Sequence, residues 1–576
     1  MVRTRVAAVE RRTAAQRRAG GSALSPPVSK GLFMSSIHCH FSSPRWQECT
    51  LSGDDGHVCG SAWLNGHRLS ASGALKQLEL AEGIEAWRKR MGDLNGFYAL
   101  VRRRGNDMVA AVDRVRSIPL YYGVHAGDVY LSDDADWVRQ QVDETQIHDE
   151  ARADFELAGY VTGQDTLFRR VKQLRAGEAL IVSDSDLGLT LSVERYFSFQ
   201  YYGMSDRDDD RRLIRLEEVV EEACQQLVRM ANGRQIVVPL SGGYDSRLIA
   251  TLLARCGYPR VLTYAYGHRD NQEAKVSREV AQSLGLPWTF VEYSQEAWSQ
   301  VADSEEYWRY QQWASGWSGI VNMQDWLAVK LLTEQGKVEP GSLFVPGHCC
   351  VTGFLLSSVF EAKRAGRLME AGELTEALRQ RHFILNESAE GEALFRERVL
   401  PRLAQDYPLD EALDPDEFIR QFVLFGWQER QAKFIVNSVR CFEFFGHDWW
   451  MPLYDRDFMA FWQSVPRHWL ERRSGYVTFV EKLFAEVSGH SAPLGNAAQQ
   501  SRRSLRARLT RLAAFRRGPG AHVKRLAKRL LPGLAQGNTL ASTGRFPPEA
   551  LERLRSQGYS HNGVAAQLFL ERFSRS

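Results

Sequence analysis

Two glycines, two serines and an aspartate follow an apolar run in VVPLSGGYDSRLIATLLAR, residues 237–255. The adjacent glycines, Gly242 and Gly243, permit a tight turn and let a ligand approach main-chain N–H groups. The helix predicted after them begins at the same place, so its positive dipole end favours phosphate or pyrophosphate. Ser241 and Ser246 add hydroxyl donors. Residues 241–246, the SGGYDS loop, are therefore predicted to bind an anion at the end of a buried strand.

Asp245 would repel a phosphate unless a cation lies between the two groups. Mg²⁺ held by Asp245 and by phosphate oxygens satisfies both, so we expect the loop to bind a nucleotide with Mg²⁺ and Asp245 to be the metal ligand. The loop is not a Walker A sequence, because GxxxxGK followed by Ser or Thr occurs nowhere in the chain. It is not the dinucleotide GxGxxG pattern either, because its glycines are adjacent.

Strand and helix patterns alternate around this loop. Buried apolar strands that alternate with helices indicate a parallel sheet with helices on both faces. Beyond residue 297 the pattern is mainly helical, interrupted by a short strand in SLFVPGHCC. Strands are predicted at 235–240, 260–266 and 288–293, and helices at 208–233, 247–256 and 271–284.

The part before this sheet, residues 34–199, is mostly strands. GFYALVRRR, DMVAAVDR, DVYLSDD and EALIVSD alternate or run apolar over strand lengths, whereas ALKQLELAEGIEAWRKRMG, residues 74–92, has helical spacing. A chain of 576 residues is expected to form two or more domains. Its net charge of +3 gives no reason to expect a nucleic acid partner. No apolar run is long enough for a transmembrane segment.

Two segments are strongly basic. Residues 1–33 carry a single acid and lack the apolar block of a secretory signal, so they are a transit peptide, a disordered extension or the result of a start assigned before Met34. From 489 to 548 there is no Asp or Glu, and arginines interleave with leucines. This pattern predicts a basic amphipathic helix. We favour a solvated face near an anionic substrate over peripheral contact of 501–530 with an anionic membrane.

The 8 cysteines are scattered without a CxxC pair, which favours a reducing, cytoplasmic setting. The sequence His348-Cys349-Cys350 allows a metal site. Adjacent ligands without a second cluster are weak support for one, so buried thiols are the favoured interpretation.

The SGGYDS loop resembles the SGGxDS loop of the ATP-pyrophosphatase superfamily at all its fixed positions. This resemblance implies that the loop grips the pyrophosphate half of ATP while a substrate oxygen attacks the α-phosphorus. The products would be an adenylate and pyrophosphate.

Other segments are similar to the asparagine synthetase family. DRVRSIPLYY, residues 113–122, resembles a DRxGxxPLYY element of its glutaminase domain, with Arg116 at the glycine position. TYAYGHRDNQEAKVSREVAQSLG is similar to the second nucleotide strand and helix of its synthetase domain. GHDWWMPLYDRDF resembles GIEARVPFLD, with Asp448, Pro452 and Asp455 in register, and FVPGHCC stands where the family has SGEGSDE. The likeness covers about residues 34–487.

The resemblance implies a two-domain fold of the α+β and α/β classes. We expect an N-terminal antiparallel-sheet sandwich of the glutaminase, N-terminal-nucleophile type. A C-terminal parallel-sheet domain of the adenine nucleotide α-hydrolase type, with a helical C-terminal part, should follow. The expected boundaries are 1–33 for the leader, 34–204 for the glutaminase-like domain, 205–500 for the ATP-pyrophosphatase domain and 501–576 for the basic helical region. A homodimer is a further expectation.

The resemblance also implies a set of ATP-binding residues. Main-chain atoms near Tyr266 and Leu240 would meet adenine, and Gly347 is what remains of the SGEGSDE loop. The phosphates would be held by Ser241, Gly242, Gly243, Asp245 and Ser246.

Three departures from the family pattern matter. A class II glutaminase uses an N-terminal cysteine, yet Met34 is followed by Ser35, and Cys39 or Cys49 would become N-terminal only by proteolysis. We therefore expect an inactive glutaminase-like domain. The acids of SGEGSDE are missing, so Mg²⁺ would depend on Asp245, phosphates and water. The family's catalytic lysine has no secure match, so the catalytic residues stay unassigned; the candidates are Lys433, Lys482, Arg502 and Arg503.

We expect an ATP-dependent ligase that adenylates a carboxylate and passes it to ammonia or a small amine. The carboxylate could be aspartate, a glycan uronate, or an acid in the same molecule as the amine. One alternative is glutamine-dependent asparagine synthesis, with a nucleophile exposed by processing or ammonia from a partner glutaminase. Another is a nucleotide-binding pseudoenzyme that serves as a scaffold at anionic membranes.

Overall fold

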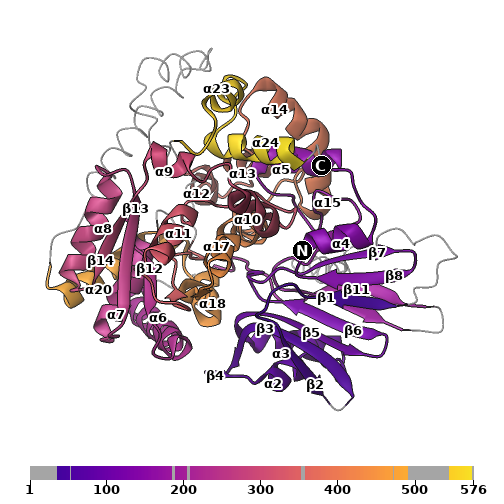
Figure 1. The fold of residues 1–576 in the computed structure, drawn as a ribbon, viewed down its shortest axis with the longest axis horizontal. Coiled ribbons are helices and arrows are strands. Elements are labelled where there is room, and N and C mark those ends of the chain that lie inside the picture. Colours follow the sequence, from indigo (N-terminus) through magenta and orange to yellow (C-terminus); the bar gives the residue numbers. More distant parts are fainter. Residues whose placement is uncertain are drawn as a thin grey trace, which may run out of the picture.

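The computed structural model describes residues 36–573 apart from 52, 185–187, 204–207, 352–356, 471–472 and 491–543. Both basic segments predicted from the sequence, 1–33 and 501–530, lie outside the described residues. The rest forms two domains that lie side by side, with an antiparallel-sheet domain first and a parallel-sheet domain second (Figure 1). No helix in the described part of the chain is long and apolar enough to cross a membrane.

The N-terminal domain is built on two sheets, which within the described residues have four and seven strands. The smaller sheet has the order β1-β8-β7-β9, and the larger has the order β11-β10-β6-β5-β3-β2, with β4 beside β3. Neighbouring strands are antiparallel except for β1 and β8. The strands are β1 Ile37–His40, β2 Gln47–Leu51, β3 Asp54–Leu64, β4 His67–Arg68, β5 Asn95–Arg104, β6 Asp107–Val112, β7 Tyr121–His125, β8 Asp128–Ser132, β9 Lys172–Gln173, β10 Glu178–Ser183 and β11 Thr190–Arg195.

Helices pack on the sheets and bury their apolar faces. The helices α2 (Ala71–Lys76) and α3 (Ile84–Asp93) pack through Trp87 on the larger sheet, and α4 (Ala135–Gln141) and α5 (Asp149–Ala158) pack on the smaller one. The single helix expected over 74–92 is wrong, because α2 ends before a turn and α3 begins after Gly83. Gly83 has φ +86, a conformation that favours glycine and interrupts a helix.

The second domain contains, within its described residues, a five-stranded parallel sheet of order β14-β13-β12-β15-β16. Its strands are β12 Ile236–Pro239, β13 Val261–Gly267, β14 Trp288–Glu292, β15 Leu343–Phe344 and β16 Asp448–Trp449. Figure 1 shows α7 (Tyr244–Arg255) and α8 (Gln272–Ser283) on one side of this sheet, with α11 (Trp326–Glu334) and α17 (Arg440–Phe444) on the other. Parallel strands place all their carboxyl ends at one edge, so the loops that follow them meet there.

The long helix α6, Asp209–Ala231, leads into this sheet. The Asp208 side chain accepts a hydrogen bond from the Arg211 amide at its start, and Asn232 adopts a left-handed conformation, φ 47, at its end. Its buried face includes Leu216, Val219 and Leu227, as its helical spacing predicts.

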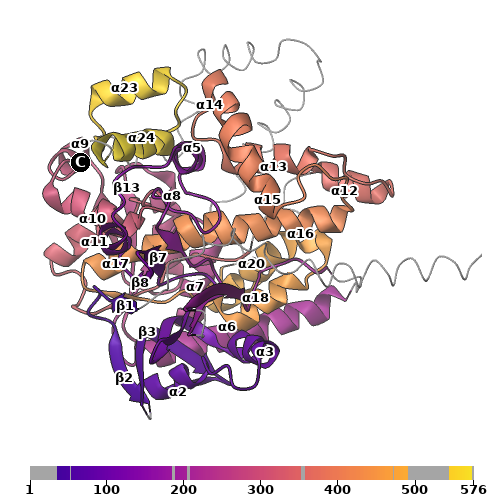
Figure 2. The same ribbon diagram turned by 90° about the vertical axis from the view of Figure 1, so that its right-hand side faces the viewer.

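The remaining helices cover the sheet edge and reach back to the first domain. Figure 2 shows the C-terminal helix α24 (His561–Phe573) beside α5, and Phe569 stacks near Phe155 with ring centroids 5.4 Å apart. The other helices are α9 Gln295–Ser299, α10 Glu305–Ser315, α12 Ser357–Arg364, α13 Glu373–His382, α14 Ala389–Leu394, η1 Phe395–Val399, α15 Leu400–Asp406, α16 Pro415–Phe425, η2 Gly426–Ile435, η3 Val436–Val439, η4 Pro452–Tyr454, α18 Arg456–Gln463, α19 Arg467–Leu470, α20 Ser474–Ser488 and α23 Pro548–Ser556.

Candidate active site

The SGGYDS loop connects β12 to α7 at the carboxyl edge of the parallel sheet. The Leu240 amide donates to the Tyr264 carbonyl at 2.8 Å, which fixes the last residue before the loop. The Ser246 hydroxyl accepts from the Ser241 amide at 3.1 Å, and the Ser241 hydroxyl accepts from the Gly243 amide at 3.2 Å. The hydroxyl groups of the two serines thus stabilise the turn by accepting hydrogen bonds from its main-chain amides. No side chain caps the start of α7, and a helix N-terminus favours an anion through its dipole.

Gly347, which follows β15, lies directly against this loop. A Cβ built on Gly347 would lie 2.8 Å from the Ser246 amide nitrogen and 3.1 Å from the Ser246 Cα. The neighbouring atoms are main chain, so a side chain at position 347 would displace the loop itself. The structure therefore brings Gly347 and the SGGYDS loop together, as the sequence predicted.

Asp245 is engaged by a residue from a distant part of the chain. Arg473 donates through Nη2 to Asp245 Oδ1 and through Nη1 to Oδ2, the latter at 3.5 Å. The Arg473 guanidinium also lies over the Tyr476 ring at 4.7 Å and within 3.9 Å of the Cys349 sulfur. Burial alone would lower the pKa of Arg473, but the Asp245 carboxylate more than offsets this, and the pKa is raised. The loop entrance therefore holds a firmly charged cation.

The end of β13 contributes an aromatic wall. The Tyr266 ring stacks on Tyr293 with centroids 4.9 Å apart, and its carbonyl accepts from the Asn271 amide group at 3.3 Å. Tyr264 donates its hydroxyl hydrogen to Asp325 at 3.1 Å. Burial raises the pKa of Asp325 to about 6, although hydrogen bonds from the tyrosines oppose this. A planar apolar group would find a matching surface here.

The loop after β15 carries His348, Cys349 and Cys350, and its groups are satisfied within the protein. His348 Nε2 lies 2.7 Å from the Ser438 hydroxyl, and burial lowers the pKa of His348 to about 4. Burial raises the pKa of both thiols, and the Cys349 sulfur accepts from the Val351 amide at 3.1 Å. Neutral, hydrogen-bonded groups support the interpretation as buried thiols over a metal site.

Comparison with protein families assigns both domains. Residues 215–474 match the asparagine synthase model, and residues 80–197 match the model of the glutamine amidotransferase domain. The chain therefore contains the two kinds of domain expected of the asparagine synthetase family, a glutamine amidotransferase domain followed by an asparagine synthase domain. The expected fold class, an antiparallel glutaminase-like sandwich followed by a parallel-sheet synthetase domain, is confirmed. The asparagine synthase match supports a carbon–nitrogen ligase in general, of a family that uses ATP.

Several solved structures are similar to parts of this chain. The NMN synthetase from Francisella tularensis is 17% identical over 24% of this chain and 54% of its own, with a TM-score of 0.16. The NH3-dependent NAD synthetase from Campylobacter jejuni subsp. jejuni is 13% identical over 36% of this chain and 100% of its own, with a TM-score of 0.19. The allosteric regulatory enzyme of purine biosynthesis is 13% identical over 56% of this chain and 60% of its own, with a TM-score of 0.17.

The match to the NMN synthetase thus spans about half of that enzyme's length. At these TM-scores the likenesses carry no argument about function. A search of the curated proteins found no match.

Among the described residues, no cluster of three or more His, Cys, Asp or Glu side chains could hold a metal ion. Asp245 would therefore hold Mg²⁺ only with phosphate oxygens and water as the other ligands. Its ion pair with Arg473 would have to open for the metal.

The lysine candidates differ in their surroundings. Lys433 is fully buried and donates to Glu429 at 2.6 Å and to the carbonyls of Val161 and Gly163 at 2.7 Å each. Lys433 therefore joins η2 to the first domain and is not an exposed helix residue. Lys482 is exposed and lies 3.9 Å from Glu486. Arg502 and Arg503 lie outside the described residues.

The first domain gives its early cysteines no catalytic setting. Cys39 lies inside β1, paired with Leu131 of β8, and its thiol is 3.7 Å from the Met108 sulfur. Burial raises the pKa of Cys39 to about 11, opposed only in part by Arg103. Cleavage to expose Cys39 as the N-terminus would remove half of the strand that holds it.

Arg116 and Asp455, which belong to the segments that resemble the family, make contacts that stabilise the fold. Arg116, which stands in place of the family's glycine, adopts φ +54 and donates to the Leu174 carbonyl at 3.0 Å. Asp455 accepts from Asn95 of β5 at 2.5 Å and is buried. The Asn95–Asp455 contact joins the two domains, whereas the Arg116–Leu174 contact lies within the first domain.

Sequence reasoning missed Arg473 and Asp325. Arg473 is one of many arginines, and its side chain meets Asp245 only through tertiary packing. Its only local signal is its position at the start of α20, where it takes a left-handed conformation with φ 60. Asp325 has no neighbouring motif, and only the tyrosines of β13 mark it.

Proposed function

We propose that the chain is an AMP- and pyrophosphate-forming ligase that adenylates a substrate carboxylate and then transfers ammonia or a small amine to it. The observation that carries the proposal is the SGGYDS loop, which joins a buried strand to the uncapped N-terminus of α7 and is packed against Gly347. Main-chain amides at a helix N-terminus suit the outer phosphates of ATP. The aromatic wall at Tyr266 and Tyr293 suits its adenine.

The protein's own groups supply charge stabilisation at this site. The positive dipole end of α7 would stabilise the negative charge that builds up as pyrophosphate leaves. Arg473 adds a guanidinium cation at the same entrance, held by Tyr476. The family's catalytic lysine has no secure match in this chain. We propose that Arg473 supplies the positive charge of that lysine.

Magnesium would neutralise phosphate oxygens when bound. Asp245 would hold it only after exchanging Arg473 for the metal, which frees the guanidinium to turn to the phosphates. The Asp245 carboxylate would therefore pair with Arg473 before the metal binds and with Mg²⁺ afterwards. The residues fit Mg²⁺ with few protein ligands, an arrangement common for this ion beside phosphates.

We propose that the amine does not come from glutamine hydrolysed by the first domain. Cys39 is a strand residue with a raised pKa, and a thiolate is the form that attacks. Ammonia, or an amine carried by the substrate, would then be the acceptor. Aspartate, a glycan uronate and an acid joined to its own amine are the substrate classes to compare. Free thiols at all 8 cysteines, each among the described residues, support a reducing compartment such as the cytoplasm.

ATP–pyrophosphate exchange tests the adenylation step. The full chain is assayed with aspartate, uronates and amino-acid-derived acids, and wild type is compared with Asp245→Ala. We expect exchange with at least one class, and a loss of about 10²-fold or more in the variant, as for the removal of a charge-stabilising group. Asp55→Ala, at an exposed position of β3, is the matched control. Exchange that survives in Asp245→Ala would remove the metal role given to Asp245.

A second candidate is a nucleotide-binding pseudoenzyme. The Asp245–Arg473 ion pair favours it, because it occupies the only carboxylate of the SGGYDS loop. Tight ATP binding without exchange for any carboxylate would support this candidate. Exchange with any of them would reject it.

A further inference from the structure

A large cavity that shares no lining residue with the SGGYDS loop lies between α9–α10 and the C-terminal segment. Its volume is about 760 Å³, and its walls come from residues 295–311, 544–548 and 565–572. This volume is within the range of small-molecule sites, roughly 300–1,000 Å³. The walls are closely fitted, because a Cβ on Gly544 would lie 2.9 Å from the Gln295 Cα. Two of the segments that form its walls therefore pack directly against each other.

Arg545 brings a buried positive charge to this cavity. It is 7% exposed, and its Nε donates to the Tyr307 hydroxyl at 3.0 Å. Its guanidinium lies over the Phe546 ring at 4.8 Å. Among the described residues its Nη2 has no hydrogen-bond acceptor. A guanidinium keeps its charge in proteins, and a buried charge without an acceptor is costly.

The acids around the cavity do not neutralise Arg545. Glu571 pairs with Arg553 at 2.8 Å. Asp303 accepts from the Trp308 indole N–H at 2.8 Å and is exposed. A second cation, Arg572, lies over the Trp308 ring at 5.5 Å. The charge balance of the cavity is therefore positive at its buried end.

Part of the lining is apolar and aromatic. Phe546 and Ala565 are buried, and Trp308 and Leu568 are half-buried beside them. These groups offer flat surfaces to a ring. The lining also includes the neutral polar side chains of Gln295, Ser299 and Gln311, which carry no charge to balance Arg545. A molecule with a flat apolar body and one anionic end would match both parts of the lining.

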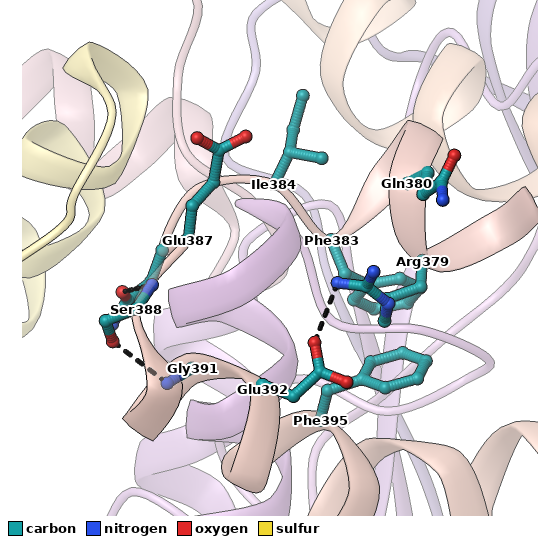
Figure 3. A pocket seen from close by; sticks show the side chains of 10 residues that line it. Arg379, Gln380, Phe383, Ile384, Glu387, Ser388, Gly391, Glu392 and Phe395 are labelled. Atoms are coloured by element: carbon teal, nitrogen blue, oxygen red, sulfur yellow. Dashed lines mark hydrogen bonds and ion pairs between the residues drawn. The ribbon is translucent and has the colours of Figure 1, made fainter. Parts of the chain in front are cut away.

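In a second cavity, the arginine side chain already has carboxylate partners within the protein. This cavity has a volume of about 390 Å³ and lies between α13 and α14 (Figure 3). Its arginine, Arg379, already donates to Glu376 at 2.7 Å and pairs with Glu392 at 3.0 Å. Figure 3 also shows Ser388 accepting from the Gly391 amide. Its cation has carboxylate partners in the protein, whereas Arg545 has none among the described residues.

We propose that the cavity at Arg545 binds a small organic carboxylate with a flat apolar body. The carboxylate meets the Arg545 guanidinium, and the ring lies between Trp308 and Phe546. One buried guanidinium balances one negative charge, so a monoanion is preferred to a dianionic phosphate. This site is separate from the SGGYDS loop and does not depend on the adenylation reaction.

Isothermal titration calorimetry on the full chain tests the site with three probes of one ring system. They are indole-3-acetate, its neutral amide and 3-indoxyl phosphate. We expect saturable binding of indole-3-acetate at one site, and at least tenfold weaker binding of the amide and of the phosphate. Arg545→Met should weaken indole-3-acetate binding at least tenfold, because a charge-assisted hydrogen bond is lost.

Two further variants keep the test decisive. Ala302→Trp fills the cavity from the end of α9 and leaves Arg545 in place, so it should abolish binding even if Arg545→Met does not fold. Arg396→Met removes an exposed arginine outside the cavity and should bind like wild type. The proposal is overturned if wild type binds none of the probes, if acid and amide bind equally, if the phosphate binds more tightly than the acid, or if Ala302→Trp binds normally.

Discussion

Arg473 and Asp245 are 228 residues apart in sequence, yet the guanidinium of the first holds the carboxylate of the second at the entrance of the SGGYDS loop. Each is about one-quarter exposed, so the pair is open to exchange with a ligand. A carboxylate in this position repels phosphate, and a cation attracts it. The pair therefore determines the charge that an entering nucleotide meets. Removal of Arg473 and removal of Asp245 should change the Mg²⁺ concentration needed for activity in opposite directions.

Replacing Arg473 by methionine should separate these effects. The loss of a cation at the leaving group is expected to lower the rate of ATP–pyrophosphate exchange by about 10²-fold. The freed Asp245 should at the same time lower the Mg²⁺ concentration needed for half-maximal exchange. Both quantities come from a magnesium titration of the exchange assay. Arg467→Met, which breaks a pair with Asp416, is the control and should change neither. A higher magnesium requirement in Arg473→Met would contradict the exchange of cations at Asp245.

Gly347→Ala should damage nucleotide binding far more than folding. The added Cβ would lie 2.8 Å from the Ser246 amide nitrogen, and a main-chain neighbour cannot rotate away. We expect affinity for a non-hydrolysable ATP analogue to fall at least tenfold, with a small change in melting temperature. Calorimetry and thermal unfolding measure the two. Gly92→Ala adds a methyl group 4.0 Å from its nearest neighbour and should leave both unchanged. Unaltered ATP affinity in Gly347→Ala would show that the nucleotide does not use this loop.

The parallel sheet could be predicted because its signals are local. The helix expected at 208–233 is observed at Asp209–Ala231, and the strand expected at 260–266 at Val261–Gly267. Apolar periodicity and a capping asparagine are enough to set such limits. The helix expected at 74–92 failed because its helical spacing continues through Gly83, whereas the chain turns there.

The candidate site was predictable only in its motif. The SGGYDS loop follows β12 and Gly347 follows β15, and the carboxyl ends of parallel strands meet at one edge of the sheet. The proximity of the loop and Gly347 follows from this arrangement. The pairing of Arg473 with Asp245 depends on how α20 packs against α7, which no local pattern encodes. The burial of Lys433 could not be predicted, because a Glu and a Lys four residues apart are typical of an exposed helix face, and here packing against the first domain buries them.

Lys433→Met tests the buried pair as a junction between the domains. Removing the lysine leaves Glu429 buried without its cation, which should cost about 3–5 kcal/mol in the free energy of unfolding. Glu429→Gln combined with Lys433→Met removes both charges and should restore part of this loss. Urea unfolding followed by tryptophan fluorescence measures both variants. Exchange activity of Lys433→Met, assayed well below its unfolding midpoint, should stay within about threefold of wild type. A loss of exchange comparable to that of Asp245→Ala (about 10²-fold), in a folded protein, would make Lys433 catalytic after all.

His348 should make the protein less stable in acid. Its pKa is about 6.5 when unfolded and about 4 in the structure, because burial outweighs the attraction of Asp245. Between these pH values the unfolded state binds one more proton than the folded state. The free energy of unfolding therefore falls as pH falls, by about 1.4 kcal/mol per pH unit for this one group. The contribution is fully present above pH 6.5 and is lost on the way down to pH 4.

His348→Gln isolates this contribution. Glutamine does not titrate and can still donate to the Ser438 hydroxyl, which His348 Nε2 approaches to 2.7 Å. Unfolding free energies of wild type and variant, measured between pH 7 and pH 4, should converge as pH falls. His382 and His561, whose pKa values burial also lowers, are present in both proteins, so the difference belongs to His348. His67→Gln, at an exposed position of β4, is the control and should parallel wild type. Parallel curves for His348→Gln and wild type would mean that His348 is solvated, and that the loop after β15 is not packed behind the SGGYDS loop as described.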